Sequence, residues 1–229
     1  PLRFLFILFP RSRDATGPLG ERIRLALEEL GPIFVKFGQA ISTRRDLLPP
    51  DIAMELAKLQ DAVPPFPAEE AAQIISDAYG QPVDDVFERF DSEPLAAASI
   101  AQVHSAQLKD GSEVIVKVLR PGVEDQIDRD LDVLRMLAGL ARRYWEHGER
   151  LKPQEVVAEY ERTIIDELDL MREAANTAQL KRNFEGSDML YVPEIYWDYC
   201  RPEVMVQERI FGTPVSDMDA LRAAGTNIQ

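Results

Sequence analysis

The sequence predicts an α+β fold, in which an antiparallel sheet with helices follows an all-helical segment. Three observations lead to this prediction. Apolar residues recur at three- and four-residue intervals through most of residues 1–90, a spacing typical of amphipathic helices. Apolar segments at 95–108 and 113–119 flank an Asp-Gly pair at 110–111, which is a strong hairpin signal. Helical spacing then returns, and two short strands are predicted to follow.

The composition is typical of a globular protein. The 229 residues are 45% hydrophobic and 29% charged, which suits one large domain or two small ones. The net charge of −14 argues against a nucleic-acid partner, because phosphate backbones are bound by concentrated Lys and Arg. Cys200 is the single cysteine, so no intrachain disulfide can form and a reducing, cytosol-facing compartment is expected. His104 and His147 lie far apart with no cysteine nearby, so no zinc site is predicted.

The first residues are apolar but too few to cross a membrane. The run at 2–9 is interrupted by Arg3 and falls short of the roughly 20 apolar residues that a span requires. No small-residue cleavage site follows it, so it is not read as a signal peptide. The chain begins with Pro1 and not Met, so we expect it to start inside a longer protein. The run is then either a helix packed on the core or an anchor in a membrane surface, with Arg11 and Arg13 near the headgroups.

Prolines and glycines divide the helical segment. A first helix is predicted from residue 19 to a break at 31–32, and a second over 33–43. A third is expected to begin at 49–51, with Asp51 as its cap. The proline-rich stretch at 64–67 reads as a stiff linker.

Two more helices are predicted before the sheet. The first covers 68–79 and ends at Gly80. The second is short, and it would carry Val83, Val86, Phe87 and Phe90. The first ninety residues are therefore expected to be almost entirely helical.

Helices and strands alternate after the hairpin. Helical spacing predicts a helix over 123–147 and a longer one from Pro153, a favourable first-turn residue, to about Phe184. Short strands are expected at 189–192 and 203–208.

A lysine lies in the middle of the second hairpin strand. Residues 114–117 read Val-Ile-Val-Lys, and a lysine in an apolar run is costly unless its charge is paired. The order of hairpin, helix and two further strands is that of the small lobe of a protein kinase. There, a strand lysine holds the ATP phosphates and a loop covers them. A functional role is therefore predicted for Lys117, with an ordinary edge-strand lysine as the alternative.

Three further motifs accompany this lysine. They are Lys-Phe-Gly-Gln at 36–39, an alanine-rich run at 95–103 where a kinase would carry glycines, and Glu-Leu-Asp at 167–169. Together with Lys117 they resemble the UbiB/ADCK family of atypical kinases, whose marks are a Lys-x-Gly-Gln helix, an alanine-rich nucleotide loop and a Glu-x-Asp element. The resemblance extends over nearly the whole chain.

The resemblance implies a nucleotide site. Lys117 would bind the ATP phosphates, and Glu208 and Ile210 would belong to a hinge at 207–210 whose backbone holds the adenine. The alanine-rich loop over the nucleotide would comprise Leu95, Ala96, Ala97, Ala98, Ser99, Ile100, Ala101, Gln102 and Val103. Supporting residues from the helical extension would be Lys36, Gly38 and Gln39.

An acidic residue of the long helix would pair with Lys117. On a regular helix Glu167 and Asp169 point in different directions, so both cannot face one target. We assign Glu173 to Lys117, and Glu167 or Asp169 to Lys36. A solvated acidic face is the alternative for any one of these acids.

These assignments divide the chain into three parts. Residues 1–90 would form the helical extension, 91–211 a kinase-like small lobe, and 212–229 the start of a second lobe. A kinase also needs a catalytic-loop Asp and Asn and a magnesium-binding Asp, and these are expected beyond residue 229. ATP and Mg²⁺ are the expected cofactors, and the fragment alone is expected to be inactive.

The resemblance also implies a biological setting. The whole protein would be a kinase or ATPase of ubiquinone biosynthesis, on the cytoplasmic side of the bacterial inner membrane. Its substrate would be an isoprenoid quinone-precursor lipid more readily than a protein, and its partners other ubiquinone-biosynthesis proteins. One alternative is a nucleotide-gated scaffold or lipid-handling factor that binds ATP without phosphoryl transfer. Another is a purely helical lipid-binding module.

Overall fold

The computed structural model describes residues 17–44, 48–59, 63–144, 148–213, 215 and 217–225. It confirms an α+β fold with an antiparallel sheet. The apolar run at 2–9, with Arg11 and Arg13, lies outside the described residues, as does His147. No helix in the described ranges is long and apolar enough to cross a membrane.

Prolines and glycines bound the helices upstream of the sheet. Pro32 and Pro50 occupy first turns, where a missing N–H costs nothing. Gly80 closes the helix over 68–79, as predicted, with a left-handed φ of 69°. These helices are α2 (Leu19–Leu30), α3 (Pro32–Ser42), α4 (Pro50–Leu56), α5 (Ala68–Tyr79) and α6 (Val83–Val86).

The described strands form one antiparallel sheet in the order β1-β3-β4-β5, with β2 also paired to β3. Gly111, with φ 91°, makes the turn of the predicted hairpin, and the Asp110 side chain accepts a hydrogen bond from the Ser112 N–H at 2.9 Å. The strands are β1 (Phe87–Phe90), β2 (Ala96–Ala97), β3 (Ala101–Leu108), β4 (Glu113–Leu119) and β5 (Val204–Glu208).

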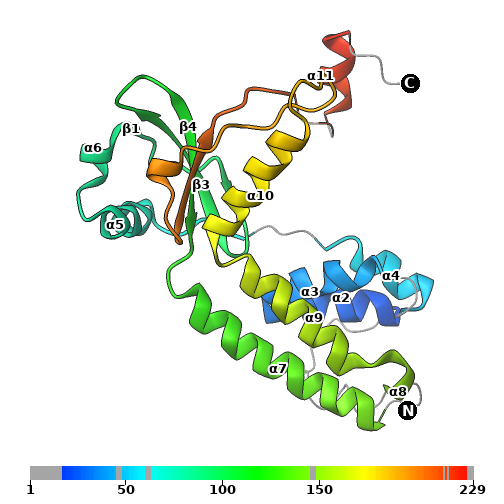
Figure 1. Cartoon of the computed structure of the whole chain (residues 1–229). Coiled ribbons are helices and arrows are strands. Elements are labelled where there is room, and N and C mark those ends of the chain that lie inside the picture. The colour runs from blue at the N-terminus through cyan, green and yellow to red at the C-terminus, as the bar shows by residue number, and fades with distance from the viewer. Residues whose placement is uncertain are drawn as a thin grey trace.

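The remaining helices connect and flank the sheet. They are α7 (Val123–Tyr144), α8 (Gly148–Leu151), α9 (Pro153–Asp166), α10 (Leu170–Asn183), the 3₁₀ helix η2 (Trp197–Tyr199) and α11 (Met218–Ala223). Figure 1 shows α7 and α9 running side by side away from the sheet, with α2, α3 and α4 beside them.

Three local predictions were wrong. Phe87 and Phe90 lie in strand β1, where Phe87 pairs with Leu108, because aromatic side chains pack well on a half-buried sheet. Residues 189–192 form no strand, and nearby only Ile195 makes a bridge, to β5. Asp51 is not a cap, since α4 already begins at Pro50 and places Asp51 in its first turn.

The two faces of the sheet pack against different helices. One face buries Val114, Val116 and Val118 with Ile75 of α5. The other buries Met205 with Leu170 of α10, in a core that continues between α7 and α9. Accordingly, Figure 1 shows α5 and α10 on opposite sides of the sheet. The alternation along β4 therefore leaves Lys117 on the side of α10.

The first part of the helical extension is attached through α3. Helices α2, α3 and α4 share a small core that contains Val35, Ile52, Leu56 and Leu59, whereas α5 packs on the sheet. From α3, the Ile33 carbonyl accepts a hydrogen bond at 2.8 Å from the buried Tyr160 hydroxyl of α9, and Phe37 meets the Tyr160 ring edge-on at 5.2 Å. These contacts place the predicted Lys-x-Gly-Gln helix against α9.

Candidate functional site

One row of paired residues crosses the sheet at Lys117. Ala96 of β2 pairs with Val103 of β3, Val103 pairs with Lys117 of β4, and Lys117 pairs with Met205 of β5. Directly paired residues of antiparallel strands lie on the same face of a sheet. We call the face of the sheet that carries Ala96, Val103, Lys117 and Met205 the site face. The alanine-rich segment and the lysine therefore share one surface.

The Lys117 ammonium is paired with a carboxylate of α10. Its Nζ lies 2.7 and 2.6 Å from the two Glu173 carboxylate oxygens, and the lysine side chain is only 22% exposed. A lysine in such a partly buried position needs a partner for its charge. This contact confirms the expected pairing of Lys117 with Glu173, and it is the pair that protein kinases form between strand and helix.

A break between α9 and α10 determines the directions in which the acidic side chains point. Glu167 ends α9, and Asp169 caps α10, its Oδ1 accepting a hydrogen bond from the Met171 N–H at 3.0 Å. The prediction of one continuous helix to Phe184 was therefore wrong. Because the chain changes direction at 167–169, the acids need not obey one helical periodicity.

Lys36 of α3 pairs with Glu167, as one of the two expected alternatives. Asp169, the other alternative, instead caps α10 with its side chain. Two ion pairs thus flank the start of α10, one to the extension and one to the sheet. The sequence could have indicated the break, because Asp is a preferred cap residue.

Gly38 and Gln39 serve the packing of the extension. A Cβ added at Gly38 would lie 2.5 Å from Leu59 Cδ1 and 2.7 Å from Leu27 Cδ1. The close approach is thus to α2 and to the segment that follows α4, and not to the sheet or the alanine-rich loop. Gln39 donates a hydrogen bond at 3.0 Å to the Leu59 carbonyl, so its amide is used at the end of α4.

The alanine-rich loop is a short hairpin with an inward-folded tip. The Leu95 N–H donates to the Val103 carbonyl at 2.8 Å, and the Ala98 N–H donates to the Ala101 carbonyl at 2.9 Å. At the tip, Ser99 and Ile100 are each 4% exposed. Both residues therefore belong to the interior of the structure.

Gln102 departs from its expected place. It pairs with Val118, one residue out of phase with the row that contains Lys117, and its side chain is fully buried on the opposite face. Its side chain therefore points away from the surface that Lys117 shares with the alanine-rich segment. One step along a strand changes the face of the sheet.

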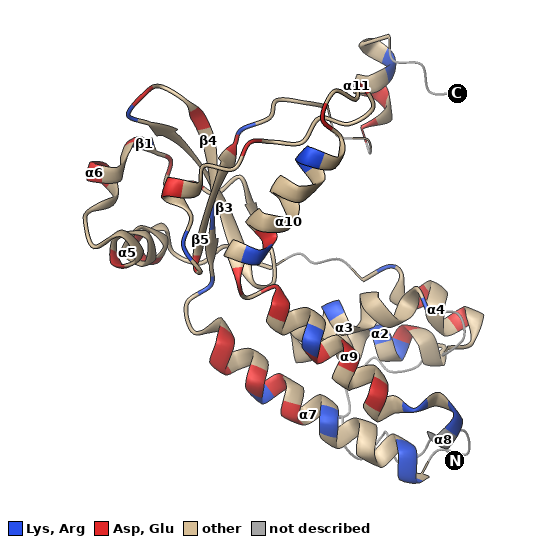
Figure 2. Cartoon of the chain, in the orientation of Figure 1, with Lys and Arg blue, Asp and Glu red and all other residues tan. Residues whose placement is uncertain are grey.

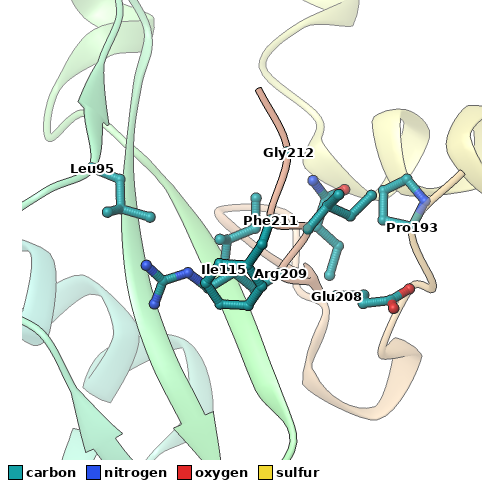
Figure 3. A pocket seen from close by; sticks show the side chains of 9 residues that line it. Leu95, Ile115, Pro193, Glu208, Arg209, Phe211 and Gly212 are labelled. Carbon is teal, nitrogen blue, oxygen red and sulfur yellow. The ribbon is translucent and has the colours of Figure 1, made fainter. Parts of the chain in front are cut away.

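A cavity of about 410 Å³ opens beside the row, at the end of β5. Ile115 of β4 lines it, and the site-face row is two residues further along that strand, or about 7 Å away. Figure 3 shows Leu95 and Pro193 on opposite sides of the cavity, with Arg209 and Phe211 between them. Its lining comprises Leu95, Ile115, Pro193, Gln207, Glu208, Arg209, Ile210, Phe211 and Gly212.

The predicted hinge residues therefore line this cavity. Leu95, Glu208 and Ile210 were predicted site residues, Arg209 lay in the predicted hinge without an assigned role, and Phe211 was missed. The Arg209 guanidinium lies 4.8 Å from the Phe211 ring centroid and pairs with Glu113 at 3.8 Å. A basic residue next to an aromatic one in the hinge segment was the available signal.

Glu208 fixes the cavity wall by its side chain. Its carboxylate accepts hydrogen bonds from the Tyr191 hydroxyl at 2.6 Å and from the Glu194 N–H at 3.0 Å. These hydrogen bonds, that of Tyr191 first, lower the pKa of the Glu208 carboxyl below its ordinary value. The charged carboxylate thus holds the 191–194 segment against β5.

The site carries charges of both signs. Figure 2 shows acidic residues on nearly all the helices, in keeping with the net charge of −14. At the site, Lys117 is paired with Glu173, and the cavity lining contains both Glu208 and Arg209. Within the described ranges, no three His, Cys, Asp or Glu side chains are grouped so as to hold a metal ion.

Comparisons with known proteins match this geometry to a family. A family model described as the ABC1 atypical kinase-like domain matches residues 58–229. A Marinobacter nauticus protein named "Probable protein kinase UbiB" is 55% identical over 231 residues, covering 100% of this chain and 42% of its own length. A protein of the same name from Azotobacter vinelandii is 59% identical over 220 residues, covering 96% of this chain and 41% of its own. The chain therefore spans about two fifths of the length of these curated relatives.

A solved structure shares the fold. The complex of Rv3197 with erythromycin from Mycobacterium tuberculosis aligns with a TM-score of 0.58 at 29% identity, covering 83% of this chain and 48% of that one. The shared fold therefore covers most of this chain.

Proposed function

Because the chain belongs to the ABC1 atypical kinase-like family, we propose that it binds ATP on the site face of its sheet. One observation carries the proposal. The glutamate-paired Lys117 lies about 7 Å along β4 from Ile115, and Ile115 lines a cavity that also has other apolar side chains in its wall. A ligand with a flat ring and an anionic tail would place the ring in the cavity and the tail at the lysine.

The residues present fit a nucleotide in three ways. Leu95, Ile115 and Ile210 offer apolar contacts to an adenine, and residues 210–212 lie in no helix or strand, as suits a hinge. Lys117 offers a cation to the phosphates, with Glu173 holding its Nζ in place. Bound Mg²⁺ would neutralise phosphate charge. The described residues contain no metal-binding cluster of their own, so residues elsewhere in the whole protein would complete that site.

For the whole protein, the names of the relatives support a kinase or ATPase of ubiquinone biosynthesis. Its substrate class would be an isoprenoid lipid, met at the cytoplasmic side of the bacterial inner membrane, with other ubiquinone-biosynthesis proteins as partners. The Lys36–Glu167 pair holds α3 beside the junction of α9 and α10, where the extension would hinder a protein substrate more than a small one. A nucleotide-gated scaffold or lipid-handling factor is the second candidate, favoured by the inward-folded loop tip.

The test is the loss of ATP binding by Lys117→Met in the full-length protein. Removing a hydrogen bond to a charged group should cost about 1.5–3 kcal/mol, or roughly ten- to a hundredfold in affinity for Mg·ATP. Lys58→Met is the matched control, because Lys58 also pairs with a glutamate but is 62% exposed on the extension. Wild-type affinity in a correctly folded Lys117→Met protein would remove this lysine from the site.

Product analysis then separates the candidate functions. A phosphorylated lipid would support the kinase, and free phosphate alone an ATPase that performs conformational work. ATP binding without either product would support the scaffold. Binding of isoprenoid lipids without any nucleotide would overturn the proposal in favour of a helical lipid-binding module.

A further inference from the structure

A linker between α4 and α5 lies along the alanine-rich loop. We call residues 63–67 the proline linker; they form no helix or strand. Three of its residues are prolines without a backbone N–H, so Phe66 carries the single backbone donor within 64–67. That N–H donates to Gln102 Oε1 at 3.0 Å, and the Phe66 carbonyl accepts from Gln102 Nε2 at 3.4 Å.

The orientation of the Gln102 side-chain amide is fixed by its hydrogen bond with His104. His104 Nδ1 lies 2.9 Å from the Asp91 carbonyl, which can only accept, so Nδ1 carries the proton. His104 Nε2 is then an acceptor, and it takes a hydrogen bond from Gln102 Nε2 at 2.8 Å. Both side chains are fully buried. The oxygen of Gln102 must therefore face the linker, because any flip would leave buried groups unsatisfied.

Arg120 joins the linker to the loop tip. It follows β4, and its Nε donates to the Ala98 carbonyl at 2.8 Å while its Nη2 donates to the Pro64 carbonyl at 2.8 Å. Its guanidinium also lies 5.4 Å from the Phe66 ring centroid. Its own N–H donates to the Ile100 carbonyl at 2.9 Å. The planar, forked guanidinium of Arg120 thus joins the proline linker to the turn at 98–100.

We propose that Arg120 and Gln102 are positioning residues for the nucleotide site, which fasten the alanine-rich turn to the proline linker. The Arg120 guanidinium fixes the turn at 98–100 before ligand binds, so a loop that covers phosphates loses less conformational freedom on binding. The extension and the loop then respond to ligand together. This inference rests on the proposed ATP binding.

The experiment uses the full-length protein with Arg120→Met and Arg120→Lys, and Arg135→Met as control. Arg135 is a comparably bonded arginine of α7, joined to Asp132 and Glu161 but far along the chain from the loop. Lysine keeps the charge but lacks the fork that reaches two carbonyls. We expect Mg·ATP binding to weaken about tenfold in both Arg120 variants, and to stay unchanged in Arg135→Met.

A second measurement needs no nucleotide. Amide hydrogen exchange at Ala98–Ala101 and at Phe66 should accelerate together in the Arg120 variants, because one side chain holds both segments. Gln102→Met combined with Arg120→Met should weaken binding less than the sum of the single changes, because both act on one linker. Circular dichroism establishes that each variant is folded.

The outcomes separate this inference from the proposed function. If Lys117→Met loses ATP while both Arg120 variants bind it normally, ATP binding stands and the positioning role is overturned. Exchange that accelerates at the turn but not at Phe66 would overturn the coupling. A wild-type protein that binds no nucleotide would overturn both proposals.

Discussion

His104 shows how a single buried side chain can depend on pH. Its ring stacks on Phe90 at 4.8 Å between centroids and is fully buried. Burial lowers the pKa of this imidazole below its ordinary value, against a smaller opposing effect of Asp91. Protonation would also place a second N–H against the donor of Gln102. The neutral ring is therefore part of the folded state.

We expect the unfolding free energy to fall as the pH drops below about 6.5, the ordinary histidine pKa. Below that pH the unfolded chain binds a proton at this histidine, whereas the folded chain does not. The contribution of the neutral ring to stability is therefore fully present above that pH and is lost progressively as the pH falls. Urea unfolding between pH 7.5 and 5.5 measures this dependence. His104→Gln should flatten it, and equal slopes in the two proteins would contradict the assignment.

Individual residues differ in how far the sequence could place them. A strand lysine pairs with a helix glutamate in a kinase-like lobe, so the contact of Lys117 with Glu173 could be predicted. The side chain of Gln102 could not be placed, because its face depends on a strand register that changes with every residue. Arg120 belonged to no motif, and its role became visible only through the two carbonyls it joins.

At the scale of elements, glycines in helices have two different meanings. Gly38 of α3 is buried, and its missing side chain lets α3 approach Leu27 and Leu59. Gly139 of α7 has as its nearest neighbour the Gln154 side-chain nitrogen, 3.9 Å from an added Cβ. The helix propensity of both positions is the same, and only the packing differs.

Gly139→Ala should therefore stabilise the protein by about 0.5–1 kcal/mol, because alanine loses less entropy in a helix. Gly38→Ala gains the same propensity but must displace two leucine side chains, and such overpacking costs about 1–3 kcal/mol. We expect a net loss of stability, measured by thermal unfolding of both variants. A stabilised Gly38→Ala protein would mean that the side chains of Leu27 and Leu59 can move aside at little energetic cost.

Element boundaries depended on the same kind of tertiary information. The turns at Gly80 and Gly111 were predictable, because a positive φ favours glycine. The break at 167–169 was not foreseen, because apolar spacing continues through Leu168 and Met171, which both pack on the core from partly buried positions. β1 was read as helix, since its pairing with distant β3 leaves no local pattern.

At the scale of the whole molecule, two ion pairs join α3 and its end to α9. Lys36 and Glu167 have side chains that are 25% and 33% exposed. Arg44 and Glu159 lie 3.7 Å apart and are 45% and 72% exposed. Screening by water makes the second pair much the weaker. The docking of the extension should thus depend on the Lys36–Glu167 pair, which also adjoins the start of α10.

Charge reversal tests this dependence. Lys36→Glu and Glu167→Lys should each lower the melting temperature, because each places like charges together in a partly buried contact. The double variant restores an attractive pair and should recover much of the loss, with a coupling energy of up to about 1 kcal/mol. The matched reversals Arg44→Glu and Glu159→Arg should change little. If the double variant lost as much stability as the two single variants together, the side chains of Lys36 and Glu167 would not interact. The extension would then be held by the Tyr160 and Phe37 contacts alone.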